Sequence, residues 1–71
     1  MTAKTAFQAD LSRFFASCDS DVSRARAIEN VHTSPEARAL IRDRLQRFAD
    51  LGRGNARDWA KRHLRTLDAL P

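Results

Sequence analysis

Hydrophobic residues recur every three or four positions along most of this chain, the spacing that places them on one face of an α-helix. The pattern is weakest in the second of four stretches. We predict helices at about residues 5–17, 21–31, 35–51 and 56–69. The joints between them are short, so the helices should pack against one another. The sequence therefore predicts an all-α fold, a small compact bundle in which residues 1–71 form a single domain.

The first predicted helix carries a large apolar load for its length. Its apolar face holds Ala3, Phe7, Leu11, Phe14 and Cys18. Phe15 widens that face. Aromatic side chains of this size usually anchor a core or an interface. We expect Phe14 and Phe15 to pack in the core, with contact to a partner as the alternative.

The third and fourth predicted helices form an antiparallel hairpin around Gly52 and Gly54. Ser34 is a suitable N-cap for the third helix, Pro35 suits its first position, and Gly52 should end it in the left-handed conformation. Asn55 should cap the fourth helix. The two apolar faces comprise Ala37, Leu40, Ile41, Leu45, Phe48 and Leu51 on the third helix and Ala56, Trp59, Ala60, His63, Leu67 and Leu70 on the fourth.

Arg44 interrupts the apolar face of the third predicted helix. A long arginine side chain can bury its stem and extend its head to water, or pair with an acidic residue inside the bundle. In the other interpretation this part of the helix is a contact surface, with Arg44 as its anchor, because arginine is enriched at interface hot spots. Both interpretations stay open.

Positive charge is concentrated in the second half of the chain. Thirteen basic residues against nine acidic ones give a net charge of +4, and the charges of residues 1–34 cancel. Such an excess favours an acidic partner, either nucleic acid or an acidic protein face, although a solvated arginine-rich surface would look the same.

The fourth helix repeats a basic residue every four positions, at Arg57, Lys61 and Arg65. Like charges at this spacing repel by a few tenths of a kcal/mol, so folding tolerates the row rather than favours it. Asp58 and Asp68 lie near enough to compensate, which leaves a solvated face as the alternative to an anion-binding or nucleic-acid-binding one. The candidate residues for such a surface are Arg38, Arg42, Arg53, Arg57, Lys61 and Arg65.

The nine residues from Ala27 to Pro35 resemble the first helix and turn of the helix-turn-helix in AraC-type regulators. That resemblance implies that the residues after Pro35 form a recognition helix. The chain departs from the family's pattern one step later, since Arg38 stands where that family has a buried aliphatic residue. The resemblance adds to the nucleic-acid hypothesis and covers no other part of the chain.

We expect no enzyme, cofactor or metal. His32 and His63 have no second ligand four residues on, Cys18 is the only cysteine, and no pair of carboxylates stands out. A lone cysteine and the absence of an export signal suggest a cytoplasmic protein. No apolar run is long enough for a bilayer, so we expect no membrane association.

Two functional hypotheses follow. The first is a non-enzymatic protein-interaction module, an adaptor, regulator or inhibitor, that docks on a larger acidic partner or forms a homodimer. The alternative is a nucleic-acid-binding regulator that uses the basic face of residues 38–65. Proteins that read DNA commonly mix Asn, Gln, Ser or Thr with arginine on the helix that enters the groove. Here the fourth helix has only Thr66 and the third only Gln46, which favours a protein partner.

Overall fold

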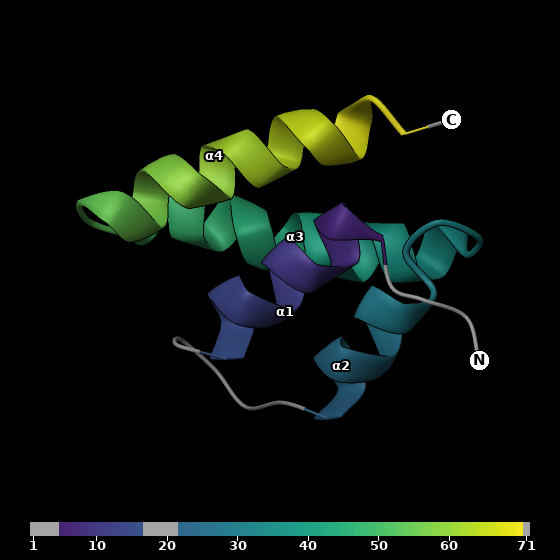
Figure 1. The fold of residues 1–71 in the computed structure, drawn as a ribbon. Coiled ribbons are helices and arrows are strands. Elements are labelled where there is room, and N and C mark those ends of the chain that lie inside the picture. Colours follow the sequence, from purple (N-terminus) through teal and green to yellow (C-terminus); the bar gives the residue numbers. More distant parts are fainter. Residues whose placement is uncertain (1–4, 17–21, 71) are drawn as a thin grey trace.

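The structure, a computed structural model of the chain, describes residues 5–16 and 22–70 and places them in four α-helices (Figure 1). The helices are α1 (Ala6–Ala16), α2 (Val22–Glu29), α3 (Pro35–Leu51) and α4 (Asn55–Asp68). These bounds confirm the predicted all-α bundle. The expectations for Ala3 and Cys18 lie outside the described residues.

The two longest helices, α3 and α4, form the predicted hairpin and share the most extensive contact in the bundle. Figure 1 shows α4 along one side of α3, with α2 on the other side. Helix α1 packs against both α2 and α4. It reaches α3 through its aromatic side chains, because the rings of Phe14 and Phe15 have centroids 5.3 and 6.4 Å from that of Phe48.

Helix α3 begins where the sequence predicts. The amide of Ala37 donates to the Ser34 hydroxyl at 3.2 Å, and Pro35 is the first helical residue. The side chain of Ser34 thus satisfies one of the amides that have no partner within the helix.

The turn between α3 and α4 differs from the prediction in two details. Gly52 is extended (φ −72°, ψ 167°) rather than left-handed, and its N–H donates to the carbonyl of Phe48 at 2.8 Å. A positive φ occurs instead at Gly54 (φ 60°, ψ −132°), which occupies the cap position of α4. Asn55 is therefore the first residue of α4 rather than its cap. Gly52 is required for a different reason, since a Cβ atom there would collide with the carbonyl oxygen of Phe48.

All four helices contribute to the core. Its buried apolar residues are Phe7, Leu11, Phe15, Ala27, Ile28, Val31, Ala37, Ile41, Leu45, Ala49, Ala60 and Leu67. Phe15 is only 1% exposed, so it lies in the core and presents no surface to a partner. Arg24 is also buried, with its guanidinium carbon 4.7 Å from the centroid of the Phe15 ring.

Two polar side chains hold the C-terminal end of α2 and the turn that follows it. The Nε2 atom of Gln8, in α1, donates to the carbonyls of Ile28 and Glu29, at 3.1 Å each. From α3, the guanidinium of Arg38 donates to Val31 at 2.8 Å and to His32 at 2.9 Å. Carbonyls at a helix end have no partner within the helix, so these donors connect α2 to both neighbours.

We predict that Arg38→Met lowers the free energy of unfolding by about 1–3 kcal/mol, because it keeps the apolar stem but leaves two carbonyls without their donors. Urea denaturation followed by circular dichroism measures the change. Arg42→Met is the matched control one turn later, since Arg42 forms an exposed ion pair with Asp68, and it should cost less than about 1 kcal/mol. Equal stability of Arg38→Met and the unsubstituted chain would contradict the prediction.

Candidate functional site

Two large hydrophobic side chains are exposed in the described part of the molecule. Leu51 is 81% exposed and Trp59 is 48% exposed. The sequence pattern assigned both to the core-facing sides of their helices, and that expectation is wrong. Leu51 is the last residue of α3, and Trp59 lies at the edge of the buried face of α4. Exposed apolar groups of this size are candidates for contact with another molecule.

Trp59 belongs to a continuous row of side chains that crosses three helices. The centroid of its ring lies 5.8 Å from that of His63, which lies 5.6 Å from Phe14, and Phe14 lies 5.3 Å from Phe48. Phe14 meets His63 and Phe48 edge to face, an arrangement that aromatic rings prefer. Leu51 extends the row past Phe48. We call Trp59, His63, Phe14, Phe48 and Leu51 the aromatic strip.

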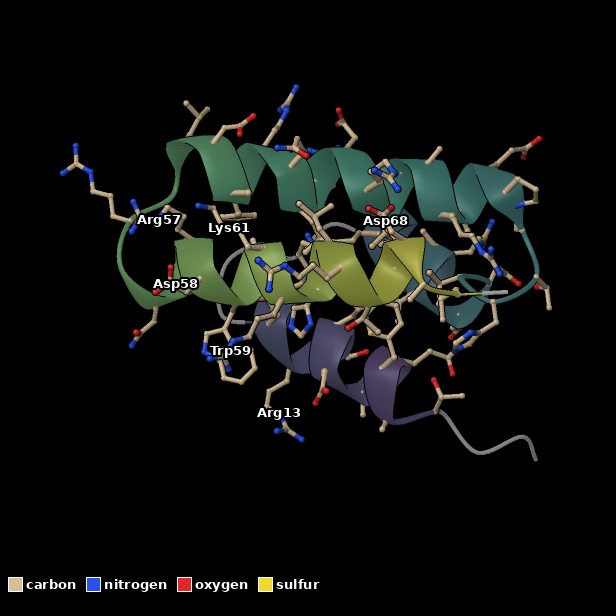
Figure 2. All side chains as sticks on the ribbon, turned by 90° about the horizontal axis from the view of Figure 1, so that it is seen from above. Arg13, Arg57, Asp58, Trp59, Lys61 and Asp68 are labelled. Carbon is tan, nitrogen blue, oxygen red and sulfur yellow. The ribbon has the colours of Figure 1, made fainter. Side chains whose placement is uncertain are left out.

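A pocket of about 280 Å³ lies at the Trp59 end of the strip. Its walls come from α1 and α4 and comprise Asp10, Arg13, Phe14, Trp59 and His63. Figure 2 shows the side chains of Trp59 and Arg13 on the same side of the molecule, projecting from these two helices. Sites for drug-sized ligands usually measure about 300–1,000 Å³, so the volume of this pocket lies at the lower limit of that range. We call it the Trp59 pocket.

A second pocket, of about 290 Å³, lies at the other end of the strip. Its lining residues come from the end of α3 and the turn after it, and are Arg44, Arg47, Phe48, Leu51 and Gly52. Phe48 of this pocket contacts Phe14 of the Trp59 pocket, so the two pockets lie on either side of that ring contact. We call it the Leu51 pocket.

Arginines surround both pockets. Arg13 lines the Trp59 pocket, and the guanidinium carbon of Arg62 lies 5.2 Å from the centroid of the Trp59 ring. Arg44 and Arg47 line the Leu51 pocket. Asp10 is the one acidic side chain among the residues that line these two pockets. Arg44 is partly exposed and lines the Leu51 pocket, whereas Phe14, also partly exposed, lines the Trp59 pocket.

His63 forms the buried part of the strip. Only 5% of it is exposed, and its ring contacts those of Phe7, Phe14 and Trp59. Burial lowers the pKa of His63 below its ordinary value of 6.5, and the charge of Asp10 partly opposes that shift. At neutral pH the ring is therefore uncharged. His32 has a different environment, since its Nε2 atom lies 2.8 Å from the hydroxyl of Thr5.

The predicted basic surface is only partly available to an anion. Arg38 binds the carbonyls of Val31 and His32 in the turn after α2, Arg42 pairs with Asp68, and Arg57 lies 3.7 Å from Asp58. The remaining candidates, Arg53, Lys61 and Arg65, are exposed on the turn and on α4. Figure 2 shows Arg57, Lys61 and Asp68 on the flank of α4 towards α3, opposite the flank that carries Trp59. The basic surface and the aromatic strip therefore lie on different sides of α4.

Sequence reasoning missed most of the strip and its rim. It assigned Trp59, Phe48 and Leu51 to the core, and it did not single out Arg13, Arg47 or Arg62. One signal was present: Arg62 follows Trp59 by three residues, a spacing that brings two helical side chains together. A second signal was the position of Leu51 directly before the glycine that ends the helix, because a side chain at a helix end has fewer neighbours to cover it.

We predict that the free energy of unfolding falls as the pH drops below 6.5, because the unfolded chain then takes up a proton that buried His63 resists. His63→Gln should flatten this dependence between about pH 7.5 and 5. Asp10→Asn should make it steeper, since the carboxylate that raises the pKa of His63 is removed. Urea denaturation at several pH values measures all three chains, and an unchanged slope in His63→Gln would contradict the assignment.

Within residues 5–16 and 22–70, no cluster of three His, Cys, Asp or Glu side chains could hold a metal ion. No helix in these ranges combines the length and apolar character needed to cross a lipid bilayer. Comparison of the chain with protein-family models, with curated proteins and with solved structures found no match.

Proposed function

We propose that this protein is a non-enzymatic interaction module that docks on a larger, acidic protein partner through the aromatic strip. The observation that carries the proposal is Trp59, 48% exposed beside a pocket and rimmed by arginines. Tryptophan and arginine are the side chains most enriched among interface hot spots. An apolar centre with a charged rim is also the usual anatomy of a protein interface.

The charge of the rim favours an acidic partner. Four arginines, Arg13, Arg44, Arg47 and Arg62, lie at the two pockets. Among the described residues, the carboxylates near them are Asp10, which lines the Trp59 pocket, and Asp43, 4.0 Å from Arg47. Complementary charge speeds association and excludes partners of the wrong sign. A second copy of the chain would bring the same arginines to the contact, so the rim favours a different protein over a homodimer. An adaptor, a regulator and an inhibitor would all use such a surface. We place the protein in the cytoplasm, because a lone cysteine such as Cys18 is typical of a reducing compartment.

The alternative function, nucleic-acid binding, has one observation in its favour. Arg53, Lys61 and Arg65 are exposed, and the described residues place no carboxylate in an ion pair with them. Three cations along a helix and its preceding turn could follow a phosphate backbone. They lie apart from the exposed tryptophan, however, so this function would leave the aromatic strip unexplained.

The docking proposal predicts that Trp59→Ala reduces capture of the partner from an extract of the source cells at least about tenfold. Lys61→Ala, on the opposite flank of α4, is the control and should change capture less than about twofold. Circular dichroism must show the same helix content in both variants. Undiminished capture by Trp59→Ala would overturn the proposal.

The nucleic-acid alternative is tested with a random DNA duplex. Under the docking proposal, binding at about 150 mM salt should be undetectable. Under the alternative, affinity should fall steeply between about 50 and about 200 mM salt. Replacing Arg53, Lys61 and Arg65 together by glutamate should then abolish binding while Trp59→Ala leaves it intact. Fluorescence anisotropy of a labelled duplex measures both variants, and this second outcome would replace the docking proposal.

A further inference from the structure

We infer that the partner segment bound by the aromatic strip is an acidic amphipathic α-helix, with one large apolar side chain in the Trp59 pocket and another in the Leu51 pocket. This inference rests on the proposed docking function and specifies the partner that the surface selects. Three properties of the described residues support it: their backbone pattern, the pair of connected pockets and the distribution of charge around them.

The backbone pattern excludes pairing by an extended strand. Residues 5–16 and 22–70 contain helices and turns and no β-strand. A peptide that binds by strand addition needs the unpaired N–H and C=O groups of a sheet edge. The described part of the chain offers no such edge, so recognition on the strip has to come from side chains. A helix that lays its apolar face on a hydrophobic groove is the recurring solution of that kind.

The two pockets match the way a helix presents its apolar side chains. Residues at i, i+3, i+4 and i+7 of a helix lie in one row. The strip likewise presents two separate cavities, of about 280 and 290 Å³. The Phe14 and Phe48 rings, which contact each other, lie between them. Each cavity suits one side chain. Two anchors on one face of a helix would fill both cavities and cover the Phe14 and Phe48 rings between them.

The charges select the polar side of that helix. Arg13 and Arg62 lie at the Trp59 pocket, and Arg44 and Arg47 line the Leu51 pocket. Carboxylates that flank each anchor would meet a guanidinium, and carboxylate–guanidinium pairs are among the stronger hydrogen-bonded contacts in proteins. Within the described part of the chain, the acidic residue paired with Arg47 is the exposed Asp43, at 4.0 Å. A basic helix would place like charges together at both ends of the strip.

A single-stranded nucleic acid is the strongest competitor for the same surface, because bases stack on exposed aromatic rings. The environment of Trp59 disfavours it. Arg62 already stacks on that ring at 5.2 Å, and His63 packs against it at 5.8 Å. A base would have to displace Arg62, whereas an apolar side chain can enter the pocket beside Trp59.

The test uses designed peptides and the fluorescence of Trp59, which is the only tryptophan of the chain. The probes are three glutamate-rich helical peptides whose two anchors, Leu and Phe, are separated by three, four or seven positions. Each has a matched peptide with lysine in place of every glutamate. An oligo(dT) strand is the nucleic-acid probe. We expect at least one acidic peptide to shift the Trp59 emission saturably, with its lysine counterpart at least about tenfold weaker.

Variants of the chain then locate the contact. Arg13→Glu and Arg47→Glu should each weaken the acidic peptide about tenfold, because each reverses a charge at one pocket. Lys61→Glu makes the same change on the opposite flank of α4 and should alter binding less than about twofold. Leu51→Ser should also weaken binding, without loss of helix content, since Leu51 is exposed.

Several results would overturn the inference. The inference is wrong if acidic and basic peptides bind equally, or if no acidic peptide binds. It is also wrong if Arg13→Glu and Lys61→Glu have equal effects, or if oligo(dT) binds more tightly than every peptide. If none of the peptides binds while capture of the natural partner still depends on Trp59, the helical partner is wrong and the docking function stands. If capture does not depend on Trp59 either, both are wrong.

Discussion

The C-terminal end of α2 is held by hydrogen bonds from two other helices, and the shape of the bundle depends on them. Helix α2 has eight residues, too few to be stable in isolation. Gln8 of α1 donates to the carbonyls of Ile28 and Glu29 at the end of α2, and Arg38 of α3 donates to those of Val31 and His32 in the turn that follows. Both donors act on one short segment, so they fix α1, α2 and α3 relative to one another. This arrangement brings Phe14 of α1 against Phe48 of α3, at the middle of the aromatic strip.

The same packing of α1, α2 and α3 holds the side chains in the middle of the aromatic strip in place. Phe14 and Phe48 are half-buried, and their neighbour His63 is almost wholly buried, so the middle of the strip is part of the molecule's own packing. Its two ends, Trp59 and Leu51, are exposed. A partner would therefore meet aromatic rings that are already ordered before binding. Preorganised side chains lose less conformational freedom on association, which leaves more of the contact energy as affinity.

The start of α3 and the four-helix fold could be predicted because they depend on local sequence. Ser34 and Pro35 act within their own turn, and helical periodicity repeats over each stretch. The exposure of Leu51 and Trp59 could not be predicted in this way, since periodicity gives the face of a helix but not the extent of its neighbours. Arg38 shows the same limit. Its sequence context suggested a basic surface, whereas the carbonyls that it binds come from a turn seven residues away.

Gly52 has two structural roles, in the hairpin turn and in the candidate site. A side chain there would collide with the Phe48 carbonyl, and the same residue forms part of the wall of the Leu51 pocket. Residue 52 therefore cannot carry a side chain without altering the surface beside it. In a genetic selection for partner binding, Gly52 would score as a recognition residue although it has no side chain to offer. A substitution at Gly52 would therefore change the stability of the fold and the choice of partner together.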